Sequence, residues 1–209
     1  LGDYENAAYQ FSDYIKKNPK NKRLSDAKLR LADSYFGSKN YSAASKVYQE
    51  LFSADAKLST DPYARYQYAQ ALYKSGKTNE AINEFRSIQE KFPNSEYAEV
   101  SLYTIGWIHF QKKEYSQAID QYNNVISKYP KTKLEPIIYY SIGDAYFNME
   151  KYDLAIENYE KVISQFPSSQ LRKEKFITAF VNMIKLKKNI RVLHQHIQTA
   201  NLLRMVITG

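Results

Sequence analysis

The sequence predicts an all-α protein, an α-solenoid of antiparallel helix-turn-helix repeats. The first observation is a repeat of 37 residues that places five alanines in register: Ala7, Ala44, Ala81, Ala118 and Ala155. The second is the spacing of apolar residues within each period at three and four positions, which is typical of helices. The third is that the 209 residues include only six glycines and six prolines, few for a β-rich architecture with many turns.

Each alanine stands in a recurring pattern. An aromatic residue follows four positions later: Phe11, Tyr48, Phe85, Tyr122 and Tyr159. A proline then follows in all repeats but one, where Ala56 replaces it: Pro19, Pro93, Pro130 and Pro167. Small residues precede the later alanines by 12 positions: Ala32, Ala69, Gly106 and Gly143. We expect these small residues to let two helix backbones approach, with the bulky aromatics filling the space around the contact.

The first elements follow from this register. Residues 1–19 match only the second helix of a repeat, so we expect the first helix of that repeat to lie upstream, in a longer solenoid. A lone second helix would leave one apolar flank uncovered. In the third repeat, Asp61 is expected to be an N-cap, followed by Pro62 at the first helical position.

The fourth repeat shows the plan most completely. Its first helix carries the stripe Leu102, Ile105, Gly106 and His109, a polar turn spans residues 112–115, and the second helix carries Ala118, Tyr122 and Val125. Pro130 closes this helix because proline cannot continue it. Thr132-x-x-Glu135 is interpreted as a capping box that opens the next helix.

The pattern fails after residue 169, which predicts an array over 1–169 (one partial and four full repeats) and a basic helical cap or tail over 170–209. The tail holds eight Lys and Arg against one Glu, whereas residues 1–169 are nearly neutral. One apolar stripe is expected to cap the fifth repeat: Phe176, Ala179, Phe180, Met183 and Ile184. A second should fold back or dock on another molecule, which makes self-association a hypothesis: Ile190, Leu193, Ile197, Ala200, Leu203 and Ile207. Beside it, these cations are expected to be solvated: Lys185, Lys187, Lys188 and Arg191.

Nothing in the sequence indicates an enzyme, a metal or a cofactor. There is no cysteine, and no glycine-rich phosphate loop is present. His194 and His196 are two positions apart and would point in different directions on a helix, while His109 occupies a packing position. No uncharged stretch exceeds 12 residues, too short to span a bilayer, so no membrane insertion is expected.

The repeat motif resembles a known family. Tyr115-Ser-Gln-Ala118 with Tyr122, Val125 and Pro130, following Leu102-x-x-Ile105-Gly106, is similar to the tetratricopeptide repeat, here with three residues more than the usual period. The resemblance covers residues 1–169 and implies a right-handed superhelix whose first helices line a concave face. Repeats of this long period resemble those of bacterial cell-envelope proteins, of the Tol–Pal-associated coordinator and β-barrel assembly lipoprotein types.

Carrying the family's concave face onto this chain predicts a partner-binding groove of three rows. The first row is Tyr66, Tyr103 and Tyr140, the second Gln70, Trp107 and Asp144, and the third Tyr73, Phe110 and Phe147; Leu29, Asp33 and Phe36 precede them in the second repeat. Tyrosine and tryptophan combine large apolar area with a polar group, which suits binding surfaces. Aromatics here also pack between repeats, so a purely structural role stays open. The face carries no ring of cations, which argues against a clamp for acidic chaperone tails.

The sequence therefore predicts a non-catalytic protein-interaction scaffold that binds a partner peptide or helix in an aromatic groove. Two alternatives are nucleic-acid or anionic-partner binding through the basic tail, and an accessory module of a larger enzyme. The envelope resemblance suggests the periplasm or the periplasmic face of the outer membrane. A chain without cysteine fits either redox compartment, so the cytoplasm is the alternative location.

Overall fold

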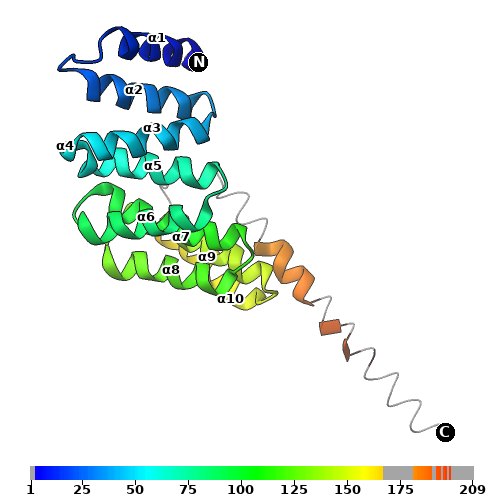
Figure 1. The fold of residues 1–209 in the computed structure, drawn as a ribbon. Helices are drawn as coiled ribbons and strands as arrows, with labels where there is room; N and C mark the ends of the chain where they lie inside the picture. The colour runs from blue at the N-terminus through cyan, green and yellow to red at the C-terminus, as the bar shows by residue number, and fades with distance from the viewer. Residues whose placement is uncertain (1–2, 167–180, 190–191, 194, 197, 199–209) are drawn as a thin grey trace, which may run out of the picture. The chain divides into compact units, whose positions relative to one another are not determined.

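The computed structural model describes residues 3–166, 181–189, 192–193, 195–196 and 198. These residues form α-helices joined by short turns, with no strand among them, which confirms the predicted all-α class (Figure 1). The helices are α1 (Tyr4–Lys17), α2 (Leu24–Gly37), α3 (Tyr41–Ala54), α4 (Ala56–Ser59), α5 (Pro62–Lys74), α6 (Thr78–Lys91), α7 (Glu96–Gln111), α8 (Tyr115–Lys128), α9 (Glu135–Asn148) and α10 (Tyr152–Gln165). Residues 181–189 are also helical.

The chain divides into two compact units, Leu1–Ile105 and Gly106–Gly209, with the boundary inside α7. Within the first unit, α1 packs on α2, α2 on α3, and α5 on α6; within the second, α8 packs on α9 and α9 on α10. Consecutive helices therefore pair as the repeat pattern predicts. The boundary between array and tail at residue 169 falls outside the described residues and stays a prediction.

The turn inside each full repeat has one recurring conformation. Lys39, Gly76, Lys113 and Glu150 all have positive φ, from 59° to 88°, and they stand one period apart. The next residue donates its N–H to a carbonyl five positions back, as Asn40 does to Tyr35 and Lys151 to Tyr146. This is the left-handed helix ending that glycine favours, yet only one repeat uses glycine.

The small residues act as predicted. A Cβ added at Gly143 would lie 2.6 Å from the Tyr159 ring, and one at Gly106 would lie 2.7 Å from the Tyr122 ring. Both rings are almost fully buried. The glycines thus leave room for the aromatic ring of the following helix, and any larger residue would displace it.

The exceptional Ala56 begins an extra element. Instead of a proline turn, the chain forms the short helix α4, whose N-cap Asp55 accepts hydrogen bonds from the N–H groups of Lys57 and Leu58. The carboxylate of Asp61 then caps α5, with Pro62 in its first turn, which confirms that prediction.

The predicted capping box at Thr132 is wrong. The Thr132 hydroxyl accepts the Leu134 N–H at 3.1 Å, and α9 begins at Glu135 itself. Glu135 is therefore the first residue of the helix, too early to reach back to the threonine. The threonine instead closes a turn before the helix.

The helical segment 181–189 covers one face of α10. Val181 and Ile184 are buried in a cluster with Ala155, Tyr159 and Val162. Part of the predicted cap is thus present, but Met183 does not belong to it because half of its surface is exposed. Phe176, Ala179 and Phe180 lie outside the described residues.

The lysines of this segment are not simply solvated as predicted. Lys185 forms an ion pair with Glu160 at 2.8 Å, and Lys188 forms one with Asp153. The Lys187 ammonium lies 5.7 Å from the Phe147 ring centre and 5.6 Å from that of Tyr152. The segment is therefore attached to its own unit by charge as well as by apolar contact.

Candidate partner-binding surface

The nine predicted groove residues lie on the first helices of three repeats. α5 carries Tyr66, Gln70 and Tyr73; α7 carries Tyr103, Trp107 and Phe110; and α9 carries Tyr140, Asp144 and Phe147. All nine side chains are partly buried, none fully buried and none fully exposed. This exposure fits side chains that bind a partner, and it equally fits side chains that pack within their own repeat.

The first row rests on the buried aromatic residues. The Tyr66 and Phe85 ring centres are 5.7 Å apart, and so are those of Tyr140 and Tyr159. In each pair, a half-buried ring of the first helix leans on a fully buried ring of the second helix. Tyr66 and Tyr140 are therefore held in a fixed orientation by the core of their own repeats.

The second row contains polar residues with partners inside the repeat. The Tyr159 hydroxyl donates to Asp144 at 2.6 Å, and Tyr48 donates to Asp33 in the same way at 2.5 Å. In the third repeat the buried ring is Phe85, which has no hydroxyl, and Gln70 instead donates to the Tyr66 hydroxyl at 2.7 Å. The carboxylates thus stand only where a buried tyrosine can reach them.

These contacts set the electrostatics of the surface. Burial raises the pKa of the Tyr159 hydroxyl, and the charge of Asp144 raises it further. Burial also raises the pKa of Asp33, although the hydrogen bond from Tyr48 acts in the opposite direction. Asp144 therefore acts first as the acceptor that positions a buried ring, rather than as a free charge offered to a partner.

Two residues of the third row, Phe110 and Phe147, contact the tyrosine that begins the second helix of their repeat. Phe110 meets Tyr115 edge to face at 5.4 Å, and Phe147 meets Tyr152 at 5.7 Å. In the fifth repeat, Lys187 lies over both rings of this pair. The chain's own helix thus already occupies part of the surface at Phe147.

Two tyrosines that the repeat analysis missed extend the surface in the first unit. Tyr97, on α7, lies 5.4 Å from Tyr66 and 6.0 Å from Tyr63 between ring centres. Tyr97 has no aromatic counterpart one period away, because Thr60 and Leu134 stand there, so a search for periodic positions could not find it. The one signal in the sequence was the concentration of tyrosines on α5, two helices earlier, which includes Tyr63 and Tyr66.

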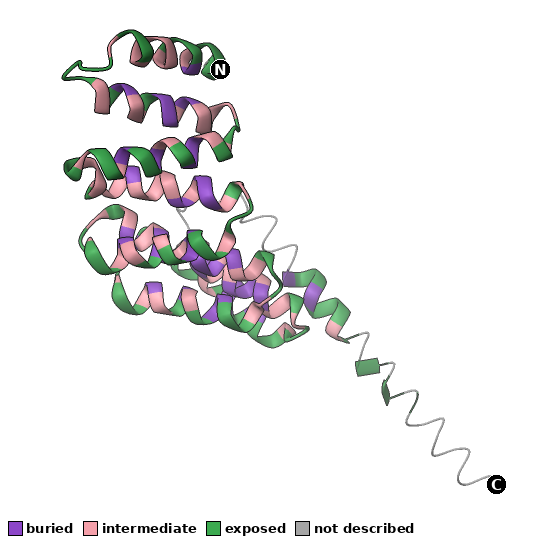
Figure 2. Ribbon diagram, in the orientation of Figure 1, coloured by how far each residue is buried: buried purple, intermediate pink, exposed green. Residues whose placement is uncertain are grey.

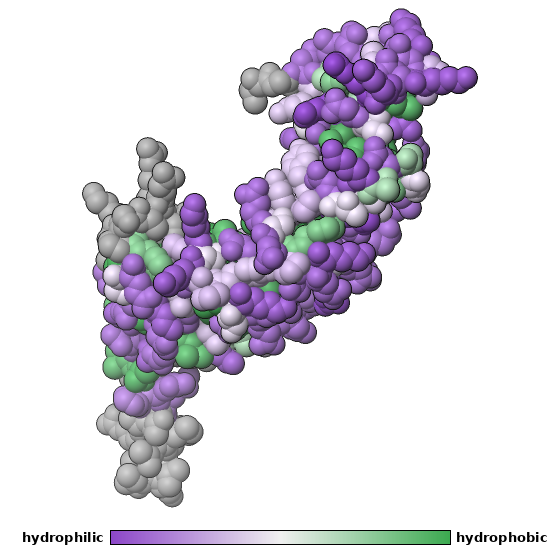
Figure 3. Space-filling view, turned by 90° about the vertical axis from the view of Figure 1, so that its left-hand side faces the viewer, coloured by the Kyte–Doolittle hydropathy of each residue, from purple (hydrophilic) through white to green (hydrophobic). Residues whose placement is uncertain are grey.

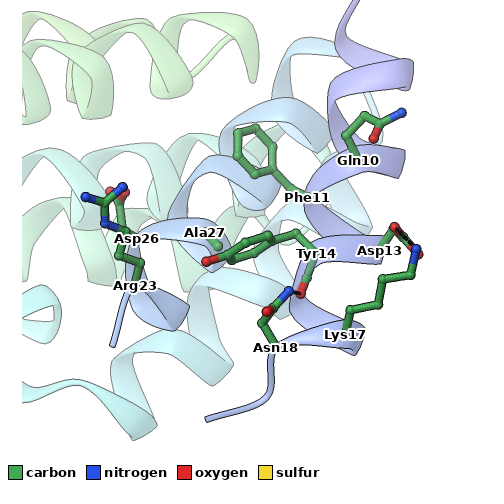
Figure 4. Close-up of a pocket in the computed structure, with 9 residues that line it drawn as sticks. All are labelled: Gln10, Phe11, Asp13, Tyr14, Lys17, Asn18, Arg23, Asp26 and Ala27. Atoms are coloured by element: carbon green, nitrogen blue, oxygen red, sulfur yellow. Dashed lines mark hydrogen bonds and ion pairs between the residues drawn. The ribbon is translucent and has the colours of Figure 1, made fainter. Parts of the chain in front are cut away.

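A separate open cleft of about 510 Å³ lies between α1 and α2. Phe11, Tyr14 and Ala27 supply its apolar surface, and Tyr14 points toward Ala27 (Figure 4). Asp13 and Lys17 form an ion pair at 2.9 Å on its border. The cleft exists because α1 is covered only by α2 among the described helices, and it contains none of the nine predicted residues.

Within the described ranges, no three metal-ligating side chains come together, and no helix is long and apolar enough to cross a membrane.

His109 lies in the last turn of α7, where its Nδ1 is 2.7 Å from Glu114 at the start of α8. Lys112 and His109 hold the pKa of Glu114 below its usual range. His109 thus links two helices, in agreement with the packing role predicted for it.

The face drawn in Figure 3 is mainly hydrophilic, with hydrophobic side chains in small separate patches.

Comparison with known proteins adds family information. Two models described as "Tetratricopeptide repeat" match the chain, one over residues 136–169 and the other over residues 63–95 and 100–132. No curated protein sequence matches it.

Solved structures share the fold at low identity. The crystal structure of MamA aligns with a TM-score of 0.62 and 22% identity, over 78% of this chain and 88% of that one. The C-terminal part of a TPR repeat-containing protein from Cytophaga hutchinsonii aligns with a TM-score of 0.71 and 19% identity, over 89% and 68%. The TPR-like repeats of a putative kinesin light chain from Podosopora anserina give 0.63 and 15%, over 81% and 90%.

Proposed function

We propose that this chain, which carries tetratricopeptide repeats between residues 63 and 169, is a non-catalytic scaffold that binds a peptide or helix of a partner protein. The contact residues are the partly exposed aromatics of the first helices: Tyr66, Tyr73, Tyr103, Trp107, Phe110 and Tyr140. Gln70 and Asp144 hold neighbouring rings in place, and Phe147 contributes at a position that Lys187 partly covers.

The observation that carries this proposal is the fixed orientation of Tyr66. Its ring contacts Phe85 and Tyr97, and its hydroxyl accepts a hydrogen bond from Gln70, yet the side chain stays partly exposed. A ring that is already immobilised loses little conformational entropy when a partner binds, so more of the contact energy appears as affinity. Pre-organised aromatics of this kind are typical hot spots.

The proposed setting is a bacterial envelope complex. It is supported by the long repeat period and by the Phe-Pro and Tyr-Pro motifs that end the second helices. A pull-down with the intact chain against envelope and cytosolic fractions of its host tests it. Retention of a partner from the cytosolic fraction alone would contradict this setting.

Binding through the basic tail is less favoured than the aromatic surface. Lys185 and Lys188 already pair with Glu160 and Asp153 of α10, so the described part of the tail offers fewer cations than its composition suggests. Salt separates the two modes, because phosphate binding weakens steeply with salt and an aromatic surface does not.

The decisive variants are Trp107→Ala and Tyr103→Ala. Each should weaken binding of the captured partner by more than about 1 kcal/mol, as expected for hot-spot aromatics, with helicity retained in circular dichroism. Arg86→Ala and Asn123→Ala, exposed residues on the second helices α6 and α8, serve as controls that should bind normally. Full affinity in the Trp107→Ala, Tyr103→Ala double variant would place the partner on another surface.

A further inference from the structure

The connection between α1 and α2 concentrates positive charge. Residues 16–23 include no Asp or Glu and carry five cationic side chains, all of them exposed: Lys16, Lys17, Lys20, Lys22 and Arg23. Figure 2 draws the loop that joins the two helices as exposed over most of its length. Within the described part of the chain, only Lys17 of these five forms an ion pair, with Asp13 of its own helix. The loop therefore presents cations that the protein itself leaves largely without a counter-charge.

The turn itself does not require this charge. In this loop the Asn21 N–H donates to the Asn18 carbonyl, and two periods later the Ser95 N–H donates to the Phe92 carbonyl in the same way. Residues 90–97, at the equivalent positions, carry one Lys and two Glu. Because the same hydrogen bond closes a loop of net negative charge, the geometry of the turn does not account for the five cations.

The helix dipoles account for only part of the charge. Lys16 and Lys17 stand in the last turn of α1, where cations are favoured. Arg23 is instead the N-cap of α2, at the positive end of that helix, and its side chain makes no capping hydrogen bond. A cation at this end of a helix is unfavourable by the same argument. A bound anion would reverse the effect, because the first N–H groups of α2 and the cations of the loop would attract the same group.

The open cleft between α1 and α2 adjoins this loop. Lys17 and Arg23 belong to residues 16–23 and also line the cleft, together with the rings of Phe11 and Tyr14 (Figure 4). Phe11 is partly exposed, whereas the aromatic ring at its register position is no more than 1% exposed in each of the other repeats. The cleft thus offers accessible aromatic surface directly beside the cations.

The cleft and the loop differ in charge. On the cleft walls, Lys17 and Arg23 are matched in number by Asp13 and Asp26, whereas the other three cations of the loop have no carboxylate beside them in residues 16–23. A complementary ligand therefore places carboxylates over the loop and an uncharged side chain in the cleft. An acidic peptide that contains one aromatic residue meets both demands. A nucleic acid is charged at every phosphate, so it is disfavoured by the two carboxylates of the cleft.

We propose that residues 16–23 and the adjoining cleft bind an acidic segment of a partner protein. Carboxylates of that segment pair with Lys20, Lys22 and Arg23, and an aromatic side chain packs on Phe11 and Tyr14. The site contains none of the nine residues of the aromatic surface on the first helices, so it is independent of the function proposed for that surface.

The first test is binding of a fluorescein-labelled peptide, Asp-Glu-Asp-Phe-Glu-Asp-Glu, to the full chain, measured by fluorescence anisotropy at low salt. The Lys20→Glu, Lys22→Glu double variant should bind about 10-fold or more weakly, because two attractive charges become repulsive. Lys131→Glu with Lys133→Glu is the matched control: it reverses two exposed charges at the same register positions three periods later and should bind as the wild type does. All four lysines are exposed, so both variants should keep the melting temperature of the wild type.

The second test examines the cleft through the peptide, so it leaves the fold of the protein untouched. Replacing the phenylalanine of the peptide by serine should weaken binding about 10-fold or more, because the burial of an aromatic side chain is lost. Added salt should weaken the binding of both peptides, because it screens the charges of the exposed loop. Equal affinity for the two peptides would contradict the part assigned to the cleft.

Three results would overturn the proposal as a whole. The first is that the phenylalanine peptide does not bind, and the second is that the control variant loses as much affinity as the Lys20→Glu, Lys22→Glu variant. The third is loss of the peptide in the Trp107→Ala, Tyr103→Ala variant, which would place it on the aromatic surface instead.

Other occupants of the loop are distinguished by the same Lys20→Glu, Lys22→Glu variant. Vesicles of phosphatidylglycerol and single-stranded poly(dT) should bind more weakly than the phenylalanine peptide. Tighter binding of either one, lost in this variant, would overturn the assignment to an acidic peptide in favour of a lipid surface or a nucleic acid. Self-association of the wild type that is lost in this variant would likewise assign the loop to a second copy of the chain.

Discussion

The third repeat (α5 and α6) and the fifth repeat (α9 and α10) share one backbone plan but stabilise it with different side chains. In the fifth, Gly143 makes room for Tyr159, whose hydroxyl donates to Asp144. In the third, Ala69 and Phe85 stand at the positions of Gly143 and Tyr159, and Gln70, which replaces Asp144, donates a hydrogen bond to Tyr66. The repeats therefore conserve the space between their helices while varying the polar contact that accompanies the buried ring.

The largest expected effect comes from filling the space between the two helices of a repeat. Gly143→Leu should lower the free energy of unfolding by roughly 1–3 kcal/mol, because even a Cβ would lie 2.6 Å from the Tyr159 ring. Gly106→Leu should behave alike. Thermal or denaturant unfolding measures the loss, with Ala69→Gly in the third repeat as a control that removes volume. An unchanged melting curve for both leucine variants would contradict the repeat register.

The next effect concerns the polar contact. Tyr159→Phe and Tyr48→Phe should each cost about 1.5 kcal/mol, the lower end of the range for a hydrogen bond to a charged group. Phe85→Tyr adds a hydroxyl opposite Gln70 rather than a carboxylate, so it should bring no comparable gain in stability. If Tyr159→Phe leaves the free energy of unfolding unchanged, the hydrogen bond to Asp144 does not stabilise the fifth repeat relative to the third.

The Tyr48 variant also has a predicted pH dependence. The pKa of Asp33 is raised above 3.8 by burial, so folding favours its protonated form, and its contribution to stability falls as the pH rises above about 4. The Tyr48 hydroxyl counteracts this by stabilising the carboxylate. The loss caused by Tyr48→Phe should therefore be larger at pH 7 than at about pH 3, where the carboxyl is protonated in both states. Equal losses at the two pH values would show that the bond does not depend on the charge.

A smaller effect separates the repeats at their turns. Gly76 and Glu150 occupy the same left-handed position, with φ of 88° and 59°. Glu150→Gly should stabilise the fifth repeat, and Gly76→Ala should destabilise the third, each by about 1 kcal/mol. Melting temperatures that move in the same direction for both variants would refute a shared turn conformation.

The smallest effect concerns the segment that covers the fifth repeat. Lys188→Ala should cost no more than about 1 kcal/mol, because its ion pair with Asp153 is exposed, and the cost should vanish at high salt. Ile184→Ala, which truncates a fully buried residue, is the contrasting variant and should cost more at any salt concentration. Hydrogen exchange over residues 181–189 would report both changes. Equal losses would mean that charge, rather than apolar contact, attaches the segment.

The sequence by itself determined the features that recur in every repeat. The period of 37 residues, the helix pairs, and the glycines beside Tyr122 and Tyr159 could all be predicted, because each imposes the same steric demand once per period. The Asp61 and Pro62 cap could also be predicted, since capping depends only on residues within one turn. The candidate surface followed from the same register, although its role in binding stays a prediction.

The tertiary structure alone decided what differs between repeats. The Tyr159 and Asp144 contact has a counterpart only in the second repeat, between Tyr48 and Asp33, and the Tyr66 and Tyr97 contact joins two helices with no aromatic counterpart to Tyr97 one period away, so neither recurs in every repeat. Met183 belongs to the same predicted apolar stripe as Ile184, yet half of its surface is exposed. Val181 and Ile184 are the residues of this segment that pack against α10. Local spacing predicts which residues share a helix face, but only packing against a neighbour decides which face is buried.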